Sequence, residues 1–140
     1  MVAQSLNEIQ VNVFDFDLVL VPINENKNHW TLLIANMKTR RITYHDPLNL
    51  SDGKSHFDTL VTLLLADYER RHPDKRKSLL PNYIHVKPTG EKLQSNKYDC
   101  GVFLCRQVRL CVDKKWESGV SPKMMRKEIT EEILNQGLKK

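Results

Sequence analysis

The chain has 140 residues, of which 40% are hydrophobic and 28% charged, and its formal net charge is +5. This length and composition predict one globular domain with its own core. The longest apolar runs are far too short to cross a bilayer, and the start shows no secretory signal, so we expect no membrane association. Three cysteines without a Cys-x-x-Cys pair argue against a disulfide framework and favour a reducing compartment, the nucleus or the cytoplasm.

Part of the positive charge is clustered at residues 70–71, 75–77 and 139–140. The first interpretation is a solvated helix end followed by a polar loop. The alternative is a nuclear-import signal or a face that meets an acidic partner. Because the basic residues are not interleaved with aromatic side chains in a recognised module, we expect no sequence-specific binding of nucleic acid.

The first half of the chain predicts a small sheet followed by a helix. Short apolar or β-branched runs at residues 18–23, 30–36 and 41–45 indicate strands, and residues 37–40 form the turn of a hairpin. Ser55 is a suitable N-cap for the helix, and Pro73 marks its end. One side of this helix carries an apolar stripe made of Phe57, Leu60, Val61, Leu64, Leu65 and Tyr68.

The second half predicts one short strand and two helices. Residues 83–87 alternate like a strand, and residues 101–112 form a helix so apolar that it should be central, with Asp99 as its cap. Ser121 and Pro122 begin the last helix, and Gly137 is expected to end it. The inner face of that helix is expected to carry Met125, Ile129 and Ile133. The whole is an α+β layout with one mixed or antiparallel sheet.

Cys100 is the strongest candidate for a catalytic side chain. It lies in the string Gln94-Ser95-Asn96-Lys97-Tyr98-Asp99-Cys100-Gly101, directly before the apolar helix. The positive field at a helix N-terminus favours the thiolate, which is the nucleophilic form of cysteine. The alternative is a buried structural thiol, an interpretation that suits Cys105 and Cys111 better because they lie within the apolar helix.

A base and a carboxylate come from the predicted hairpin. A tight turn between two paired strands places Trp30 and His45 near the same end of the sheet, so the side chains of His29 and Asp46 can meet. His29 is then a candidate general base, and Asp46 would orient its imidazole. The alternatives are a loop histidine, a core or rim aromatic at Trp30, and an Asp46-Pro47 pair that only opens a turn.

Gln94 is a candidate oxyanion donor that would work together with the backbone N–H of Cys100. The alternative is an ordinary glutamine on a surface loop. Metal ligation by His45, Asp46 and Cys100 has no supporting paired-ligand spacing, so we expect neither a metal nor a cofactor.

Several stretches together resemble the Ulp/sentrin-specific protease family, cysteine peptidases that process and remove SUMO-type modifiers. They are residues 14–23, His29-Trp30, residues 42–46 and residues 94–104, in that family's order His, Asp, Gln, Cys. The resemblance implies a papain-like α+β fold with the nucleophile on a central helix. It implies that His29, Asp46, Cys100 and Gln94 are catalytic, and that Trp30 roofs a tunnel for the modifier's Gly-Gly tail. Asp99 and Gly101, which flank the nucleophile, are expected to contact the substrate.

Two features depart from the family pattern. Pro47 stands where the family commonly has Ser, and family domains usually carry an N-terminal region that binds the modifier. We therefore expect residues 1–140 to form a single Ulp-type domain that lacks this region, which a partner segment would replace. The resemblance implies cleavage after the Gly-Gly of a SUMO-like protein, in precursors and conjugates. Alternatives are a truncated, non-catalytic domain that binds the modifier, a protease for another ubiquitin-like protein, and an acyltransferase.

Overall fold

The structure is a computed structural model that describes residues 11–76, 80–86, 94, 96, 98–112 and 121–138. Its elements within these ranges follow in chain order. They are the 3-10 helix η1 (Val13–Asp15), strands β1 (Leu18–Glu25), β2 (His29–Asn36) and β3 (Arg41–His45), helix α2 (Lys54–Arg71), strand β4 (Ile84–Val86), and helices α3 (Cys100–Val112) and α4 (Pro122–Leu138).

The four strands form one mixed sheet in the order β1-β2-β3-β4, which confirms the predicted α+β class. Strands β1, β2 and β3 pair antiparallel, whereas β4 runs parallel to β3. The predicted turn at residues 37–40 is present, and the side-chain oxygen of Asn36 accepts hydrogen bonds from the main-chain N–H of Lys38 and Thr39 at 3.1 and 3.0 Å. This turn fixes the register in which Leu32 lies opposite His45.

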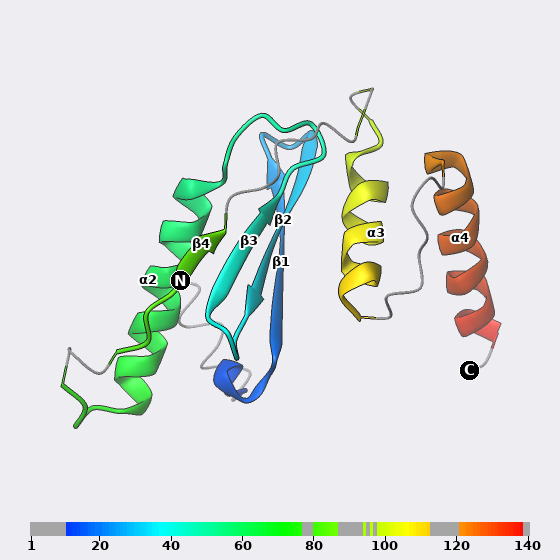
Figure 1. The fold of residues 1–140 in the computed structure, drawn as a ribbon. Coiled ribbons are helices and arrows are strands. Elements are labelled where there is room, and N and C mark those ends of the chain that lie inside the picture. Colours follow the sequence, from blue (N-terminus) through cyan, green and yellow to red (C-terminus); the bar gives the residue numbers. More distant parts are fainter. Residues whose placement is uncertain are drawn as a thin grey trace.

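The helices lie on both sides of the sheet (Figure 1). Helix α2 lies against one face, α3 lies on the opposite side, and α4 lies beyond α3, farther from the sheet. Within the ranges that the structure describes, no helix is both long and apolar enough to cross a membrane.

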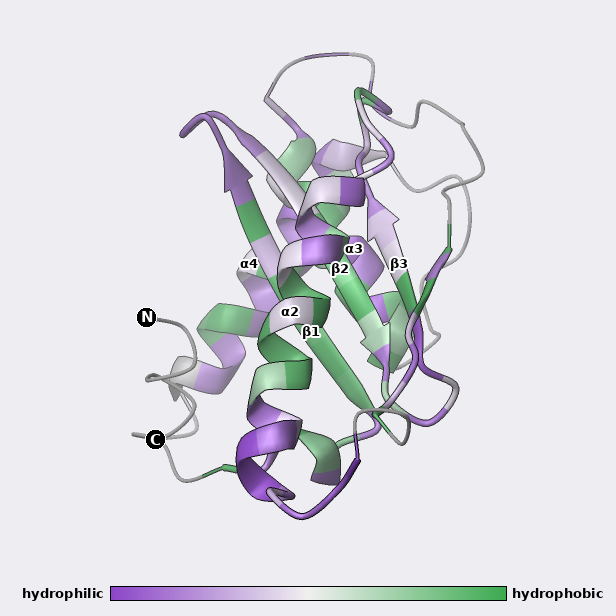
Figure 2. Ribbon diagram, turned by 90° about the vertical axis from the view of Figure 1, so that its left-hand side faces the viewer, coloured by the Kyte–Doolittle hydropathy of each residue, from purple (hydrophilic) through white to green (hydrophobic). Residues whose placement is uncertain are grey.

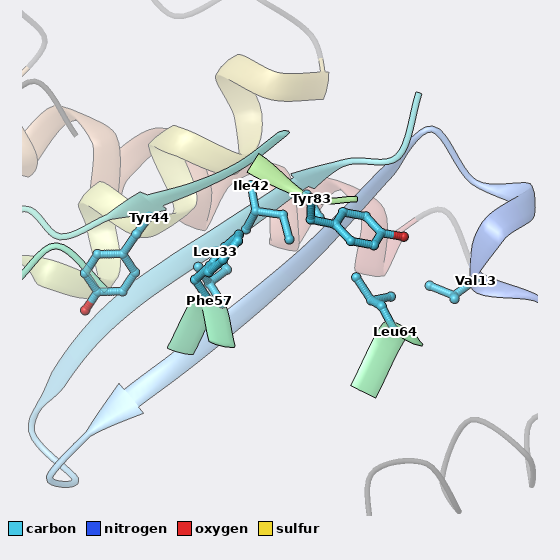
Figure 3. Close-up of a cluster of buried hydrophobic side chains, with 8 residues drawn as sticks. Val13, Leu33, Ile42, Tyr44, Phe57, Leu64 and Tyr83 are labelled. Atoms are coloured by element: carbon cyan, nitrogen blue, oxygen red, sulfur yellow. The ribbon is translucent and has the colours of Figure 1, made fainter. Parts of the chain in front are cut away.

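The main core lies between α2 and the sheet. Leu33 and Ala35 point toward α2, whereas the alternating residues Leu32 and Ile34 point to the other face, where α3 contacts β2. All four are buried, which explains why β2 is an unbroken apolar run. Figure 2 shows apolar residues along β1 and β2 behind α2. The core cluster, most of which Figure 3 labels, consists of Val13, Leu33, Ala35, Ile42, Tyr44, Phe57, Leu64 and Tyr83.

Helix α2 begins earlier than predicted, and Ser55 is not its cap. The helix starts at Lys54, and the residue before it, Gly53, has a left-handed conformation with φ of 70° and makes no side-chain cap bond. A Cβ atom at Gly53 would overlap the buried ring of Tyr44. The close approach of the main chain to this ring therefore sets the start of α2, and only glycine fits there.

Helix α3 is less buried than its apolar sequence predicts. It lies between β2 and α4, but only Cys100 and Val102 are buried on it. Cys105 is exposed and Cys111 half-buried, so the prediction that both are buried thiols is wrong for Cys105. Burial raises the pKa of the Cys111 thiol. Because only β2 and α4, among the described elements, cover α3, its other faces are accessible to solvent even where their residues are apolar.

Helix α4 begins as predicted but is buried only near its start. Pro122 is its first residue, and the Ser121 hydroxyl accepts a hydrogen bond from the Met124 N–H at 3.3 Å. Met125 is fully buried and Ile129 half-buried, but Ile133 is 66% exposed, so its place on an inner face was predicted wrongly. The helix also continues through Gly137 to Leu138. Burial on this face therefore falls off toward the C-terminal end of α4.

Candidate active site

His29 and Asp46 meet at one end of the sheet. His29 is the first residue of β2, and Asp46 directly follows β3, so the hairpin register places them on adjacent strand ends. Nε2 of His29 lies 2.7 Å from Oδ1 of Asp46, and their side chains are only 10% and 2% exposed. The contact that the hairpin predicted is confirmed. A buried carboxylate on one ring nitrogen fixes both the orientation and the tautomer of an imidazole.

Asp46 is itself held by the turn that follows it. Its Oδ1 accepts the N–H of Leu48 and its Oδ2 accepts the N–H of Leu50, both at 2.9 Å. The carboxylate therefore opens a turn and orients His29 at the same time, so the two interpretations of Asp46 are compatible. Its position does not depend on the histidine alone.

Cys100 comes from a different element, the start of helix α3. It is the first residue of the helix, as the sequence predicts within one position, and it is 3% exposed. Its sulfur accepts the main-chain N–H of Trp30 at 3.3 Å. The residue before Trp30 is His29, whose Nδ1 is buried and has no hydrogen-bond partner among the described residues. One imidazole nitrogen is thus bound to Asp46, and the other has no partner within the described structure. The residue that carries this ring directly precedes the one whose N–H contacts the thiol.

Gln94 is buried, so the alternative of a surface loop residue is wrong. It is 1% exposed, and its main-chain N–H donates to the carbonyl of Pro47 at 2.9 Å, which ties it to the turn after Asp46. Its side-chain Nε2 donates to the carbonyl of Asn96 at 2.5 Å. An amide NH₂ group has two hydrogens, so one remains for a further acceptor. The role of oxyanion donor stays a prediction.

A cleft of about 970 Å³ opens beside the cysteine. Trp30, 40% exposed, forms part of its wall, and a Cβ atom added to Gly101 would lie 3.6 Å from the Trp30 ring. His29, Asp46 and Gln94 are not among the described residues that line it. The lining consists of Pro22, Lys27, Asn28, Trp30, Tyr98, Cys100, Gly101, Val102, Leu104, Cys105, Arg126, Ile129 and Thr130. The cleft therefore reaches the nucleophile candidate.

Asp99 has internal partners rather than an open carboxylate. It is 6% exposed, its Oδ1 accepts from Arg126 at 2.9 Å, and its Oδ2 accepts from the side chain of Asn96 at 2.6 Å. These two hydrogen bonds lower the pKa of Asp99. The side-chain cap expected for α3 is replaced by these contacts, although the Asp99 carbonyl does accept the N–H of Val102 at 3.1 Å. Substrate contact by Asp99 stays a prediction.

Arg126 and Asn96 are site residues that the sequence did not indicate. Both were ordinary polar residues, one in a loop and one on the exposed face of a helix. Nothing in the spacing of 27 positions between Arg126 and Asp99 indicates that they meet. Only the arrangement of α4 beside α3 brings them together.

The described part of the chain contains no set of side chains that could bind a metal ion. No group of three or more His, Cys, Asp and Glu side chains there is placed to hold an ion. His45 is half-buried, and this burial lowers the pKa of its imidazole.

A buried carboxylate holds the histidine, and a cysteine at a helix N-terminus contacts the next residue of the same strand. This arrangement supports nucleophilic thiol chemistry. Residues 2–138 match the Ulp1 protease family, C-terminal catalytic domain, and the chain belongs to that family. Sentrin-specific protease 2 of Rattus norvegicus is 29% identical over 130 residues, which are 91% of this chain and 22% of that protein.

Two solved structures show the same fold. The "SUMO protease Ulp1 with the catalytic cysteine oxidized to a sulfenic acid" has a TM-score of 0.67 at 24% identity, covering 98% of this chain and 61% of that one. The C-terminal Ulp1 protease domain in complex with SMT3, the yeast orthologue of SUMO, has a TM-score of 0.54 at 24% identity, covering 78% and 49%. The chain thus spans less than two thirds of the solved Ulp1 chains, and about a fifth of the rat protein.

Proposed function

We propose that this chain is a cysteine isopeptidase domain that cleaves after the C-terminal Gly-Gly of a SUMO-like modifier. The observation that carries the proposal is the set of contacts around His29. Its Nε2 is held by Asp46 at 2.7 Å, its Nδ1 is unpaired within the described structure, and the next N–H along β2 meets the Cys100 sulfur at 3.3 Å. Membership of the Ulp1 protease family supports the same reaction.

In the proposed reaction, His29 accepts the proton of the Cys100 thiol, and the thiolate attacks the carbonyl carbon of the last glycine. The C–N bond to the leaving amine breaks as His29 returns its proton to that nitrogen, which leaves a thioester on Cys100. Water, deprotonated by His29, then attacks the thioester and releases a carboxylate and the free thiol. Gln94 and the Cys100 N–H would bind the oxyanion in both halves.

The substrate class follows from the relatives and from the form of the site. Relatives carry the name sentrin-specific protease, and one solved relative holds SMT3. Gly101 and Trp30 both line the cleft, and a tail without side chains can lie close to an aromatic ring at its wall. The mechanism needs a reduced thiol, and all three cysteines are free, which fits a reducing compartment such as the nucleus or the cytoplasm.

The decisive experiment uses modifier probes that carry a C-terminal electrophile. We expect the SUMO probe, and not the ubiquitin probe, to form a covalent adduct at Cys100, located by peptide mass spectrometry. His29→Ala should slow adduct formation by at least about 100-fold, because the base is lost. Cys100→Ser should abolish turnover of a SUMO precursor.

Lys127→Met is a control for substitution as such, because Lys127 is an exposed residue of α4 outside the site. Its adduct rate should equal that of the unaltered chain. If the folded chain forms no adduct yet binds SUMO, the non-catalytic alternative is correct. An adduct with ubiquitin alone would assign another modifier, and labelling of Cys100 by acetyl-CoA would support acyl transfer.

A further inference from the structure

Arg126 links the last helix to the residue before the nucleophile candidate. From the first turns of α4, its Nη2 donates to Asp99 Oδ1 at 2.9 Å and to the carbonyl of Tyr98 at 3.2 Å. One guanidinium nitrogen thus binds a side chain and a main-chain group of consecutive residues. Cys100 follows directly in the chain, so Arg126 acts on the main chain that leads into α3.

Asn96 continues this linkage toward Gln94. Its side-chain oxygen accepts the main-chain N–H groups of Tyr98 and Asp99, each at 3.0 Å, while its Nδ2 donates to Asp99 Oδ2 at 2.6 Å. Its main-chain carbonyl accepts the side-chain amide of Gln94 at 2.5 Å. A continuous set of hydrogen bonds therefore runs from α4 through Asp99 and Asn96 to the predicted oxyanion donor.

The Asp99 carboxylate is the centre of this set and depends on Arg126. It is 6% exposed, and Arg126 is the cation that the structure places on it. A buried carboxylate that loses its cation is left with an uncompensated charge, which strongly disfavours the local conformation. The other oxygen remains bound to Asn96, so the change would pass to the main chain that Asn96 holds.

We propose that Arg126 is a positioning residue that acts through Asp99 and Asn96, fixing the main chain that presents Cys100 and the Gln94 amide. The inference rests on the proposed function, because it assigns Arg126 to the geometry of that same reaction. An oxyanion donor works only when it is already in place, and a misplacement of about 1 Å costs about 100-fold in rate. A contact from a different helix can supply that placement.

Arg126 also lines the cleft, with its side chain 53% exposed, so a direct contact with the modifier is the competing role. The two roles differ in their kinetics. A substrate contact made equally in the ground and transition states changes KM and leaves kcat unchanged. A positioning residue changes kcat and leaves KM unchanged.

The first test is steady-state kinetics of SUMO-precursor cleavage. Arg126→Met should lower kcat by about 10- to 100-fold with KM changed less than about twofold. Arg126→Lys should recover part of the loss, because it restores a cation near Asp99. Asp99→Asn should give a similar loss, and the double variant should be no worse than the stronger single variant, because both changes break one contact. Lys127→Met removes the same charge from α4 and should leave kcat unchanged.

The second test does not need turnover. Amide hydrogen exchange at Tyr98 and Asp99 should become faster in Arg126→Met, while exchange in α2 stays the same. If the unaltered chain fails to cleave any modifier, the proposed function fails, and this measurement still decides whether Arg126 holds the segment. Unchanged exchange, an unchanged kcat, an effect on KM alone, or additive losses in the double variant would each overturn the inference.

Discussion

The sheet with α2 and the pair α3–α4 are built in different ways. Every residue of the main core cluster lies in the part formed by η1, the sheet, Tyr83 and α2. By contrast, α3 buries only Cys100 and Val102, and Met125 is the fully buried side chain described on α4. Exposed apolar residues of the second region include Val112, Met124, Ile133 and Leu134. The main core cluster therefore lies in the first region, whereas α3 and α4 bury few side chains of their own.

The difference teaches how the candidate site is assembled. His29 and Asp46 belong to the tightly packed region, whereas Cys100 and Gln94 belong to the chain around the start of α3. Contacts across the boundary include the Trp30 N–H to the Cys100 sulfur and the Gln94 N–H to the Pro47 carbonyl. Hence the proposed chemistry depends on the relative placement of two regions that differ in burial.

The largest expected difference between the two regions is in the unfolding free energy lost when a leucine is truncated. Leu64, on α2, is 2% exposed, and Leu64→Ala should cost about 3 kcal/mol of unfolding free energy through lost burial and a cavity. Leu104→Ala on the half-buried α3 should cost about 1 kcal/mol. Urea unfolding measures both. Equal costs would show that α3 is packed as tightly as α2.

Two glycines, one in each region, should respond with opposite signs. Gly53→Ala should cost about 2 kcal/mol or more, because φ is 70° and the new methyl group would overlap the Tyr44 ring. Gly101→Ala should gain about 0.5 to 1 kcal/mol, because the site is helical and the nearest contact is an ordinary 3.6 Å. Thermal unfolding of the two variants tests the pair, and a stabilised Gly53→Ala would contradict the close approach.

The smallest expected effect is on the loss of stability at acidic pH, to which Asp67 of α2 in the first region contributes. Burial alone would raise the pKa of Asp67, but hydrogen bonds from Arg71 and Arg70 outweigh it and the pKa is lowered. The ionised form therefore stabilises the fold above the ordinary value of 3.8, and this contribution is lost as the pH falls below it.

Asp67→Asn should thus cost about 1 kcal/mol at pH 7 and flatten the loss of stability between about pH 5 and 2. Asp58→Asn is the matched control on the same helix, because Asp58 is 58% exposed. Unfolding curves at several pH values measure both, and parallel acid limbs for Asp67→Asn and the unaltered chain would refute the assignment.

The sequence predicts the first region better than the second for a physical reason. Alternation and unbroken apolar runs reflect burial in a sheet, and the hairpin of β2 and β3 sets the register by itself, so the His29–Asp46 contact could be predicted. The position of Cys100 at a helix start likewise follows from the local sequence.

Features set by tertiary contacts could not be predicted in this way. The start of α2 depends on a ring from β3, and the exposure of Cys105 and Ile133 depends on how many neighbours α3 and α4 have. The Arg126–Asp99 contact joins helices far apart in the sequence, with no local pattern to announce it. Apolar periodicity shows which face of a helix can be buried, and not whether a neighbour covers it.

Through the hydrogen bond from the Trp30 N–H to its sulfur, Cys100 connects strand β2 of the sheet to helix α3. A group attached to that sulfur, from an oxygen atom to an inhibitor, changes the acceptor that the Trp30 N–H of strand β2 contacts. Covalent occupancy should therefore be visible in the melting temperature of the chain as well as in its loss of reactivity. The thermal stability of the chain should therefore depend on the chemical state of this thiol.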